Sequence, residues 1–333
     1  MSTTAIEHFK LAEVDGLQII SLVDNSVDFL STINRKEVQS FRQWTKKRHG
    51  EEWARTHSQL PLAEHGFSML VRVLARGKSG NILFDTGSSP DSVVENATRM
   101  GLDLSEVESV VLSHGHYDHS GGLLSALKAI NKGDLPVIVH DDMFKKRGVA
   151  NQNGTIRAYP EFPTKDQIGS ARLISTKKPI LIADELVLIT GEIPRETSFE
   201  KGFSQHRAFL NGSWQPDPWI WDDRAVLINV KRKGLVILSG CAHAGIVNTI
   251  LYAQQITGIK DVFAVVGGFH LAGKEGERKI DQTVRELKRI NPTLVAPSHC
   301  TGWKALLAMA QAMPDAFVWN SVGSLYQLSN DKK

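Results

Sequence analysis

The chain has 333 residues, of which 41% are apolar and 23% charged, and its net formal charge is only +3. This apolar share is enough for a sizeable core. The small net charge argues against nucleic acid or an anionic membrane as the main partner. No apolar run reaches the roughly 18 residues that span a bilayer, and no N-terminal stretch has the pattern of a signal peptide.

Cysteine is rare in the chain, which contains only Cys241 and Cys300. Two cysteines cannot form the disulfide framework of a small secreted protein. We therefore expect both to be reduced thiols and the protein to be cytoplasmic.

The first 140 residues predict a mixture of strands and helices. In chain order we expect a strand at 17–23, a helical insertion at 34–60, a β-hairpin at 67–84, a helix at 92–100, a strand at 107–113, a helix at 123–130 and a strand at 136–140.

Two stretches interrupt the pattern in the second half, 141–178 and 196–224, and we expect them to be surface excursions. Apolar strands are expected around them at 181–182, 186–190, 225–230, 235–239, 262–266 and 294–296. Several of these strands run into a loop that contains histidine, as the strand at 107–113 also does. This looks like an internal duplication in which two half-domains direct their loops to one edge. No linker is visible, so residues 1–333 are expected to form a single domain.

The strand at 107–113 leads directly into the pattern His-x-His-x-Asp-His. Histidines two apart in a tight loop can face the same pocket, so His114 and His116 suit one metal ion. Asp118 and His119, at the start of the next helix, suit a second ion about 3.5–4 Å away. The alternative is a cluster of capping and hydrogen-bonding side chains. It is disfavoured because burying three histidines and a carboxylate without a metal is costly.

The order of these features resembles the metallo-β-lactamase superfamily over nearly the whole chain. A strand ends in Asp85, the histidine motif follows, and later loops carry His243, His270 and His299. Further stretches are similar to the subgroup named for 7,8-dihydropterin-6-methyl-4-(β-D-ribofuranosyl)aminobenzene-5′-phosphate synthase, namely 191–195, 240–245, 267–271 and 298–302. The resemblance implies an α/β fold, a four-layer αββα sandwich, with insertions at about 34–60, 141–178 and 196–224.

The sequence departs from the superfamily pattern at two places. The usual histidine of the third motif is missing, and Thr190 stands near that position. Cys241 occupies the position of the usual bridging aspartate. We interpret His243 as the replacement ligand for the ion held by His114 and His116. Cys241 is either a bridging thiolate or a small buried residue, and the sequence favours the second reading.

The resemblance assigns roles to the remaining candidates. His299 is expected to bind the second ion together with Asp118 and His119, and Asp85 to brace the histidine loop by hydrogen bonding. For His270 a catalytic contact, a ligand role and a supporting role all stay open. The other candidates are His65 as a pocket residue, Thr301 at a helix start that could contact phosphate, and His49, His57, His140 and His206 as exposed or structural residues.

These features predict a hydrolase, or an enzyme of a related displacement reaction, in which two divalent cations activate a hydroxide and Asp118 orients it. Zinc is the favoured metal, with iron and manganese as alternatives. The expected substrate is a small anionic molecule, phosphorylated or pterin-like. The alternatives are a pterin-forming synthase or transferase, as the subgroup name implies, and a non-catalytic metal-containing binding protein. An oxygen-reducing iron enzyme would need a flavin domain, and a nucleic-acid-processing hydrolase would need a basic groove.

Overall fold

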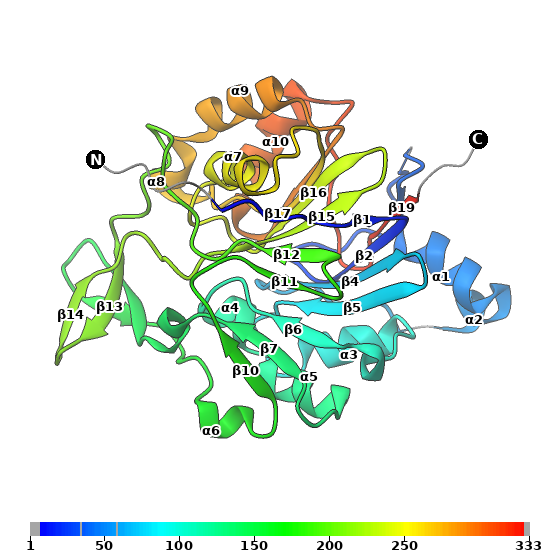
Figure 1. Cartoon of the computed structure of the whole chain (residues 1–333), viewed down its shortest axis with the longest axis horizontal. Coiled ribbons are helices and arrows are strands. Elements are labelled where there is room, and N and C mark those ends of the chain that lie inside the picture. The colour runs from blue at the N-terminus through cyan, green and yellow to red at the C-terminus, as the bar shows by residue number, and fades with distance from the viewer. Residues whose placement is uncertain (1–6, 34, 58, 330–333) are drawn as a thin grey trace.

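The computed structural model describes residues 7–33, 35–57 and 59–329. Two β-sheets lie between two layers of helices, and a small third sheet projects at one end (Figure 1). The predicted fold class, an α/β four-layer sandwich with insertions, is confirmed.

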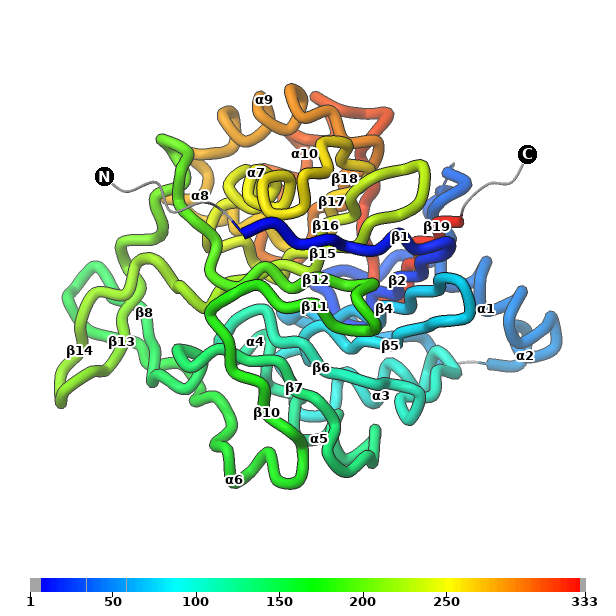
Figure 2. The backbone as a smooth tube through the Cα atoms, in the orientation of Figure 1, coloured from blue at the N-terminus to red at the C-terminus, as the bar shows by residue number. Residues whose placement is uncertain are grey.

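The first sheet carries the second half of the chain and has seven strands. Strands β16, β17 and β18 are parallel to one another, because a helical segment returns the chain after β16 and again after β17. In spatial order the strands are β11 (Ile180–Ile182), β12 (Val187–Ile189), β15 (Ala225–Val230), β16 (Gly234–Ser239), β17 (Val262–Gly268) and β18 (Leu294–Ser298). The helices of this half are α7 (Ile246–Thr257), α8 (Gly273–Glu277), α9 (Ile280–Ile290) and α10 (Trp303–Ala312), with a 3₁₀ turn at His299–Thr301. Strand β1 (Glu13–Val14) joins this sheet beside β15, although the two are far apart in sequence (Figure 2).

The second sheet carries most of the first half and has eight strands. In spatial order they are β10 (Arg172–Ser175), β7 (Pro136–Val139), β6 (Ser109–Val111), β5 (Lys78–Phe84), β4 (Ser68–Ala75), β2 (Gly16–Val23), β19 (Leu325–Ser329) and β3 (Val38–Gln39). Strands β5, β6 and β7 are parallel. Their connections contain α3 (Ser92–Arg99), a 3₁₀ turn at Leu104–Glu106, α4 (Tyr117–Ser120) and α5 (Leu123–Ile130).

Alternating side chains explain why the layers form. In β2, Leu17 and Ile19 belong to the core between the two sheets, whereas Ile20 and Leu22 belong to the core that includes residues of α3 and α5. Strand β16 follows the same rule, with one set of side chains between the sheets and the other packed with α7, α9 and α10. Each aliphatic side chain that is fully buried in this way contributes about 1.5–3 kcal/mol.

The helical insertion expected at 34–60 contains α1 (Phe41–His49) and α2 (Glu51–Thr56). Residues 34 and 58 of this prediction lie outside the described residues. Ser40 and Gln43 form a capping box at the start of α1. Trp44 is buried and its indole N–H donates to the carbonyl of Gly323 at 2.7 Å, which fastens the insertion to the body of the protein.

The stretch 141–178 is more regular than the sequence analysis predicts. It contains a 3₁₀ turn (Asp141–Phe144), β8 (Arg147–Ala150), β9 (Ile156–Ala158), α6 (Lys165–Ile168) and β10, and β10 extends the second sheet beside β7. Strands β8 and β9 belong to the small third sheet and lie in a polar stretch. The sequence therefore lacks the apolar runs by which strands are predicted.

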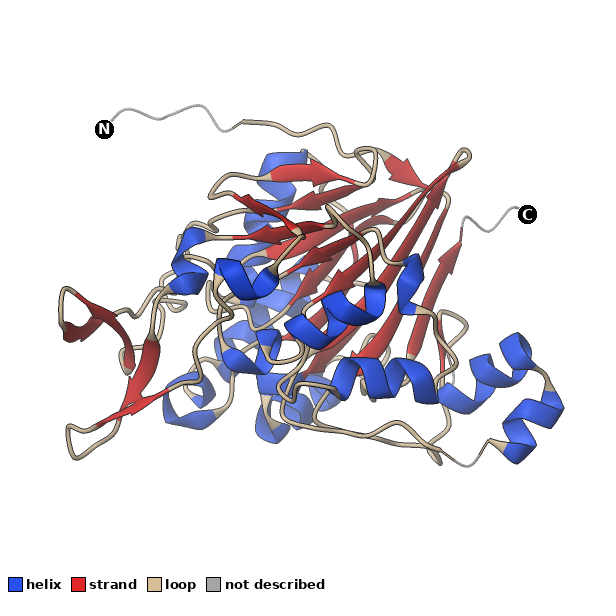
Figure 3. Ribbon diagram, turned by 90° about the horizontal axis from the view of Figure 1, so that it is seen from below, coloured by secondary structure: helices blue, strands red, loops and turns tan. Residues whose placement is uncertain are grey.

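The excursion at 196–224 contributes the other half of that third sheet, as the hairpin of β13 (His206–Leu210) and β14 (Ser213–Pro216). Strand β13 pairs with β8, so the two insertions are joined to each other. This sheet stands apart from the long strands at one end of the molecule (Figure 3). In the described part of the chain, no helix is long and apolar enough to cross a membrane.

Candidate metal centre

The candidate residues lie in loops that leave the carboxyl ends of parallel strands. Asp85 follows β5, the His-x-His-x-Asp-His motif follows β6, and later loops follow β16, β17 and β18. The carboxyl ends of parallel strands meet at one edge, so loops distant in sequence converge there. Four non-glycine residues in these loops have positive φ angles: Asp85 at 61°, Ala242 at 51°, His270 at 44° and His299 at 47°. Such strained backbone concentrates at functional sites.

A first set of histidine nitrogens is formed by His114, His116 and His243. Nε2 of His114 lies 3.0 Å from Nδ1 of His116 and 3.1 Å from Nε2 of His243. All three rings are buried. Burial lowers the pKa of each ring well below its usual value, which leaves neutral imidazoles with free lone pairs. Three neutral imidazoles in one pocket are a suitable ligand set for a divalent transition metal.

A second set is formed by Asp118, His119 and His299. Nε2 of His299 lies 3.2 Å from Oδ2 of Asp118 and 3.1 Å from Nε2 of His119. Burial alone would raise the pKa of Asp118. The neighbouring histidines His119 and His299 outweigh burial and hold that pKa well below its usual range. The carboxylate is therefore charged and available to a cation.

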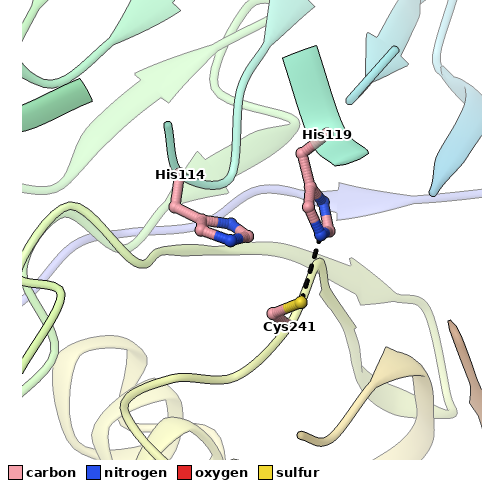
Figure 4. Close-up of side chains that lie close together, drawn as sticks. All are labelled: His114, His119 and Cys241. Atoms are coloured by element: carbon pink, nitrogen blue, oxygen red, sulfur yellow. Dashed lines mark hydrogen bonds between the residues drawn. The ribbon is translucent and has the colours of Figure 1, made fainter. Parts of the chain in front are cut away.

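Cys241 lies between the two sets. Its Sγ atom is 3.1 Å from Nε2 of His119, and one ligand nitrogen of His114 lies within 4.8 Å of the same sulfur (Figure 4). The thiol is buried, and burial raises its pKa. This place is compatible with a bridging thiolate and with a small buried residue alike.

Asp85 contacts two residues at the histidine motif, His119 and Ser113. Its Oδ2 atom lies 2.7 Å from Nδ1 of His119, and its two oxygens accept hydrogen bonds from the backbone N–H and the hydroxyl of Ser113, each at 2.6 Å. Gly240 packs against the same pair, and a Cβ atom there would collide with Ser113 and Asp85. Glycine at this position lets the loops after β5, β6 and β16 meet.

The histidine motif lies in a part of the chain that matches a protein-family model. The model of the metallo-beta-lactamase superfamily matches residues 63–253, which is more than half of the chain. The chain belongs to the metallo-β-lactamase superfamily.

Two relatives from Methanocaldococcus jannaschii extend this result. One is named 7,8-dihydropterin-6-methyl-4-(beta-D-ribofuranosyl)-aminobenzene-5'-phosphate synthase and is 33% identical over 248 residues, covering 73% of this chain and 83% of the relative. The other is an uncharacterised protein, 32% identical over 267 residues, covering 79% of this chain and 93% of the relative. The resemblance to the synthase subgroup is thus confirmed.

Among solved structures, the chain is similar to Tm1679, described as a metal-dependent hydrolase of the β-lactamase superfamily. The TM-score is 0.70 and the sequence identity 23%, with 94% of this chain and 100% of that chain covered. At this identity the similarity supports the fold.

Thr190 stands near the position at which the superfamily usually carries the histidine of its third motif. In this structure the threonine has another role. The Thr190 hydroxyl is buried and accepts a hydrogen bond from the backbone N–H of Ala225 at 3.0 Å, so this residue serves strand pairing. Within the described residues, His243 is the side chain that completes the first set with His114 and His116.

The remaining candidates surround the two sets. His65 is exposed, and its Nε2 atom is 3.5 Å from Oδ2 of Asp118. His270 has its ring centroid 4.2 Å from that of His243. Thr301 is fully buried, and its hydroxyl accepts from the backbone N–H of Phe269 at 3.0 Å. The hydroxyl of Thr301 therefore supports the loop of His270, and the contact of the backbone N–H groups at 301–302 with a phosphate stays a prediction.

Two aspartates that the sequence analysis did not identify hold the loops of the first set. Oδ2 of Asp222 accepts from the backbone N–H of Gly115 at 2.9 Å, and Oδ2 of Asp223 accepts from the backbone N–H of Ala244 at 2.9 Å. Arg147 of β8 binds both oxygens of Asp222, at 2.8 and 2.6 Å. The insertions thereby brace the backbone beside each histidine of this set.

His140 and His206 are expected from the sequence to be exposed or structural, and both are buried, which excludes the exposed alternative. His140 has a structural place, with Nε2 3.0 Å from Glu192 and Nδ1 accepting from the N–H of Asp142 at 3.0 Å. His206, on β13, lies beside the first set, with ring centroids 5.4 Å from His116 and 5.2 Å from His243. No motif marks His206 in the sequence.

Tyr159, which follows β9, is another residue near the motif that the sequence did not indicate. Its ring centroid is 5.2 Å from that of His116 and 5.8 Å from that of Tyr117. Burial raises the pKa of its phenol to about 12, so the hydroxyl stays protonated at neutral pH. The insertions thus contribute both an imidazole and a phenol to the surroundings of the motif.

Proposed function

We propose that this protein is a metal-dependent hydrolase, or an enzyme of a related displacement reaction, that uses two divalent cations on a small anionic substrate. The observation that carries the proposal is the pair of ligand sets, one of three histidines and one of Asp118, His119 and His299, with the Cys241 thiol between them. Membership of a superfamily rich in metal-dependent hydrolases supports it.

The residues fit divalent metal ions. Ring nitrogens converge in both sets, with Nε2 of His114 3.1 Å from Nε2 of His243 and Nε2 of His299 3.1 Å from Nε2 of His119, and a cation satisfies such lone pairs together. His114, His116 and His243 would hold one cation, and Asp118, His119 and His299 the other. Nitrogen ligands with one carboxylate and one thiol favour zinc, with iron and manganese as alternatives.

Two bound cations would lower the pKa of a water molecule and polarise the substrate's carbonyl or phosphoryl oxygen. The protein's own groups orient these partners. Asp118 stays ionised and accepts the hydrogen bond that aligns the attacking water. Asp85 fixes the His119 ring through Nδ1, so that Nε2 faces the centre. His65, which is exposed beside Asp118, is placed to contact a bound substrate.

The test combines metal analysis with turnover. Purified protein is loaded with zinc, iron(II) or manganese and offered phosphoesters, lactones and pterin-like compounds. We expect turnover that depends on metal, and we expect His116→Ala to lower both metal content and turnover. The matched control is His57→Ala, because His57 stacks on Trp53 in the helical insertion, away from the motif. A correctly folded wild-type protein that binds no metal would overturn the proposal.

The named relative supports a second candidate, the pterin-forming synthase reaction. In that case the same cations would assist a displacement in which the amine of a ribofuranosylaminobenzene phosphate loses a proton and forms a bond to the methyl carbon on a dihydropterin, while the anionic group that activates this carbon leaves. The two candidates are separated by offering both reaction partners together. Product that contains both ring systems supports the synthase, and consumption of one partner by water supports the hydrolase. Metal binding without any turnover across the panel would indicate a non-catalytic binding protein.

A further inference from the structure

A third group of histidines lies next to the centre and includes two that the proposed pair of cations does not use. One ligand nitrogen from each of His206, His243 and His270 lies within 4.8 Å of the others. The group shares only His243 with the His114, His116 and His243 set. Its other members come from β13, in the insertion at 196–224, and from the loop after β17.

Among the described residues, one ring nitrogen of each histidine in this group lacks a hydrogen-bond partner. Nδ1 of His206, of His243 and of His270 is buried without a hydrogen-bond partner in the part of the chain that the structure describes. His243 already directs Nε2 toward His114, at 3.1 Å. The buried His140 shows the contrast, because both of its ring nitrogens have partners. A buried nitrogen left unpaired is costly, so these atoms indicate that a ligand belongs beside them.

The rings are packed in a way that holds them in place. Their centroids are 4.2 Å apart for His243 and His270, 5.2 Å for His206 and His243, and 6.0 Å for His206 and His270. Phe203 packs against all three rings, at 4.2 Å from His270, 5.7 Å from His206 and 5.9 Å from His243. Phe203 thereby fixes the three rings relative to one another.

The backbone also positions these histidines. His270 has a φ angle of 44°, which is strained for a residue with a side chain. His206 is the first residue of β13 and pairs with Val149 of β8, so the small third sheet places it at the centre. Strain and strand pairing are both retained at a position where three histidine side chains converge.

We propose that His206, His243 and His270 form a third metal position, for a late divalent transition metal such as zinc or cobalt, beside the two-cation centre. His243 would then hold one ion through each ring nitrogen, as an imidazolate whose ring proton is released to solvent, and His206 and His270 would complete three nitrogen ligands with a fourth coordination position free. The insertion at 196–224 then has a chemical role, since it supplies a ligand that the β-sandwich itself lacks. This position goes beyond the two cations of the proposed function.

The experiment counts metal ions. Protein stripped with a chelator is titrated with cobalt(II), followed by absorbance and by elemental analysis after desalting. We expect the wild type to bind three equivalents, and His206→Gln and His270→Gln to bind two each. The control is His140→Gln, a buried histidine outside the group, which should still bind three. Circular dichroism and thermal melting establish that each variant is folded.

The spectrum provides a second readout that does not depend on a variant. The third equivalent should add ligand-field bands without a thiolate charge-transfer band, because the group contains no cysteine. Saturation of the wild type at two equivalents would overturn the inference, as would an unchanged count in His206→Gln and His270→Gln. Loss of two or more equivalents in a folded His206→Gln variant would also overturn it, because His206 would then belong to the main centre.

These results are separable from those that test the proposed function. Three bound ions without turnover of any substrate would count against the hydrolase proposal and leave the third position standing. Two bound ions with full turnover would support the hydrolase and remove the third position.

Discussion

The carboxylate of Asp222 accepts a hydrogen bond from the backbone N–H of Gly115 at 2.9 Å. Gly115 stands between His114 and His116, so this bond fixes the loop that presents both rings. Asp222 also forms a fully buried ion pair with Arg147, whose closest N–O distance is 2.6 Å. An insertion thus acts on the backbone of the metal-binding motif.

Asp222→Ala is expected to weaken both the fold and metal binding. It leaves the Arg147 guanidinium buried with Asp217 as its one remaining acidic partner among the described residues, and breaking a buried ion pair costs about 3–5 kcal/mol. Urea denaturation measures this loss, and metal titration should show weaker binding at one position. The control is Glu52→Ala, which removes the exposed Glu52–Arg55 pair and should change stability by less than about 0.5 kcal/mol. Equal effects of the two substitutions would contradict the bracing role.

His243→Ala tests the replacement of the missing third-motif histidine. His243 is placed beside His114, so its removal should lower metal content and reduce activity by roughly 10–100-fold or more. Elemental analysis and steady-state kinetics measure both effects. Unchanged metal affinity would exclude His243 as a ligand and make His270 the better candidate.

The histidine motif and its supporting aspartate could be predicted from the sequence because their signals are local. The four candidate metal ligands of the motif lie within six consecutive positions, and Asp85 follows a recognisable strand. Asp222 and Gly115, in contrast, are 107 residues apart, and nothing in the sequence near Asp222 indicates which loop it contacts. His206 and Tyr159 stand in the insertions, where polar residues on short strands obscure the two-residue period. The direction of the Cys241 side chain depends on loop backbone, including the positive φ of Ala242, which a sequence pattern does not reveal.

Glu200 gives the stability of the protein a pH dependence. Its carboxylate accepts hydrogen bonds from the backbone N–H groups of Val247, at 3.0 Å, and Asn248, at 2.7 Å, in the first turn of α7. Burial outweighs these bonds and raises the pKa of Glu200 from 4.5 to about 7. The folded state therefore binds the proton more tightly than the unfolded state does. The resulting stabilisation is present below pH 4.5 and is lost as the pH rises through about 7.

A shift of this size corresponds to roughly 3 kcal/mol. Glu200→Gln cannot ionise, so the free energy of unfolding of the variant, relative to wild type, should rise between pH 5 and pH 8. Urea denaturation across this range measures the difference. The exposed Glu161→Gln should run parallel to the wild type. A Glu200→Gln curve that also runs parallel would show that the carboxyl is not protonated in the folded protein.

Cys241 is the residue at which this chain departs most from its superfamily, and its sulfur lies where both ligand sets can reach it. If it binds metal as a thiolate, cobalt-substituted protein should show a thiolate-to-metal charge-transfer band. The thiol should also resist alkylation until the metal is chelated. The band should disappear in Cys241→Ser. Cys300→Ser is the matched control, because Cys300 is the other buried cysteine and its thiol donates to the carbonyl of Cys241 at 3.6 Å. A band that survives in Cys241→Ser and vanishes in Cys300→Ser would assign the ligand to Cys300 instead. If no band forms in the wild type, Cys241 is a small buried side chain whose sulfur does not bind metal.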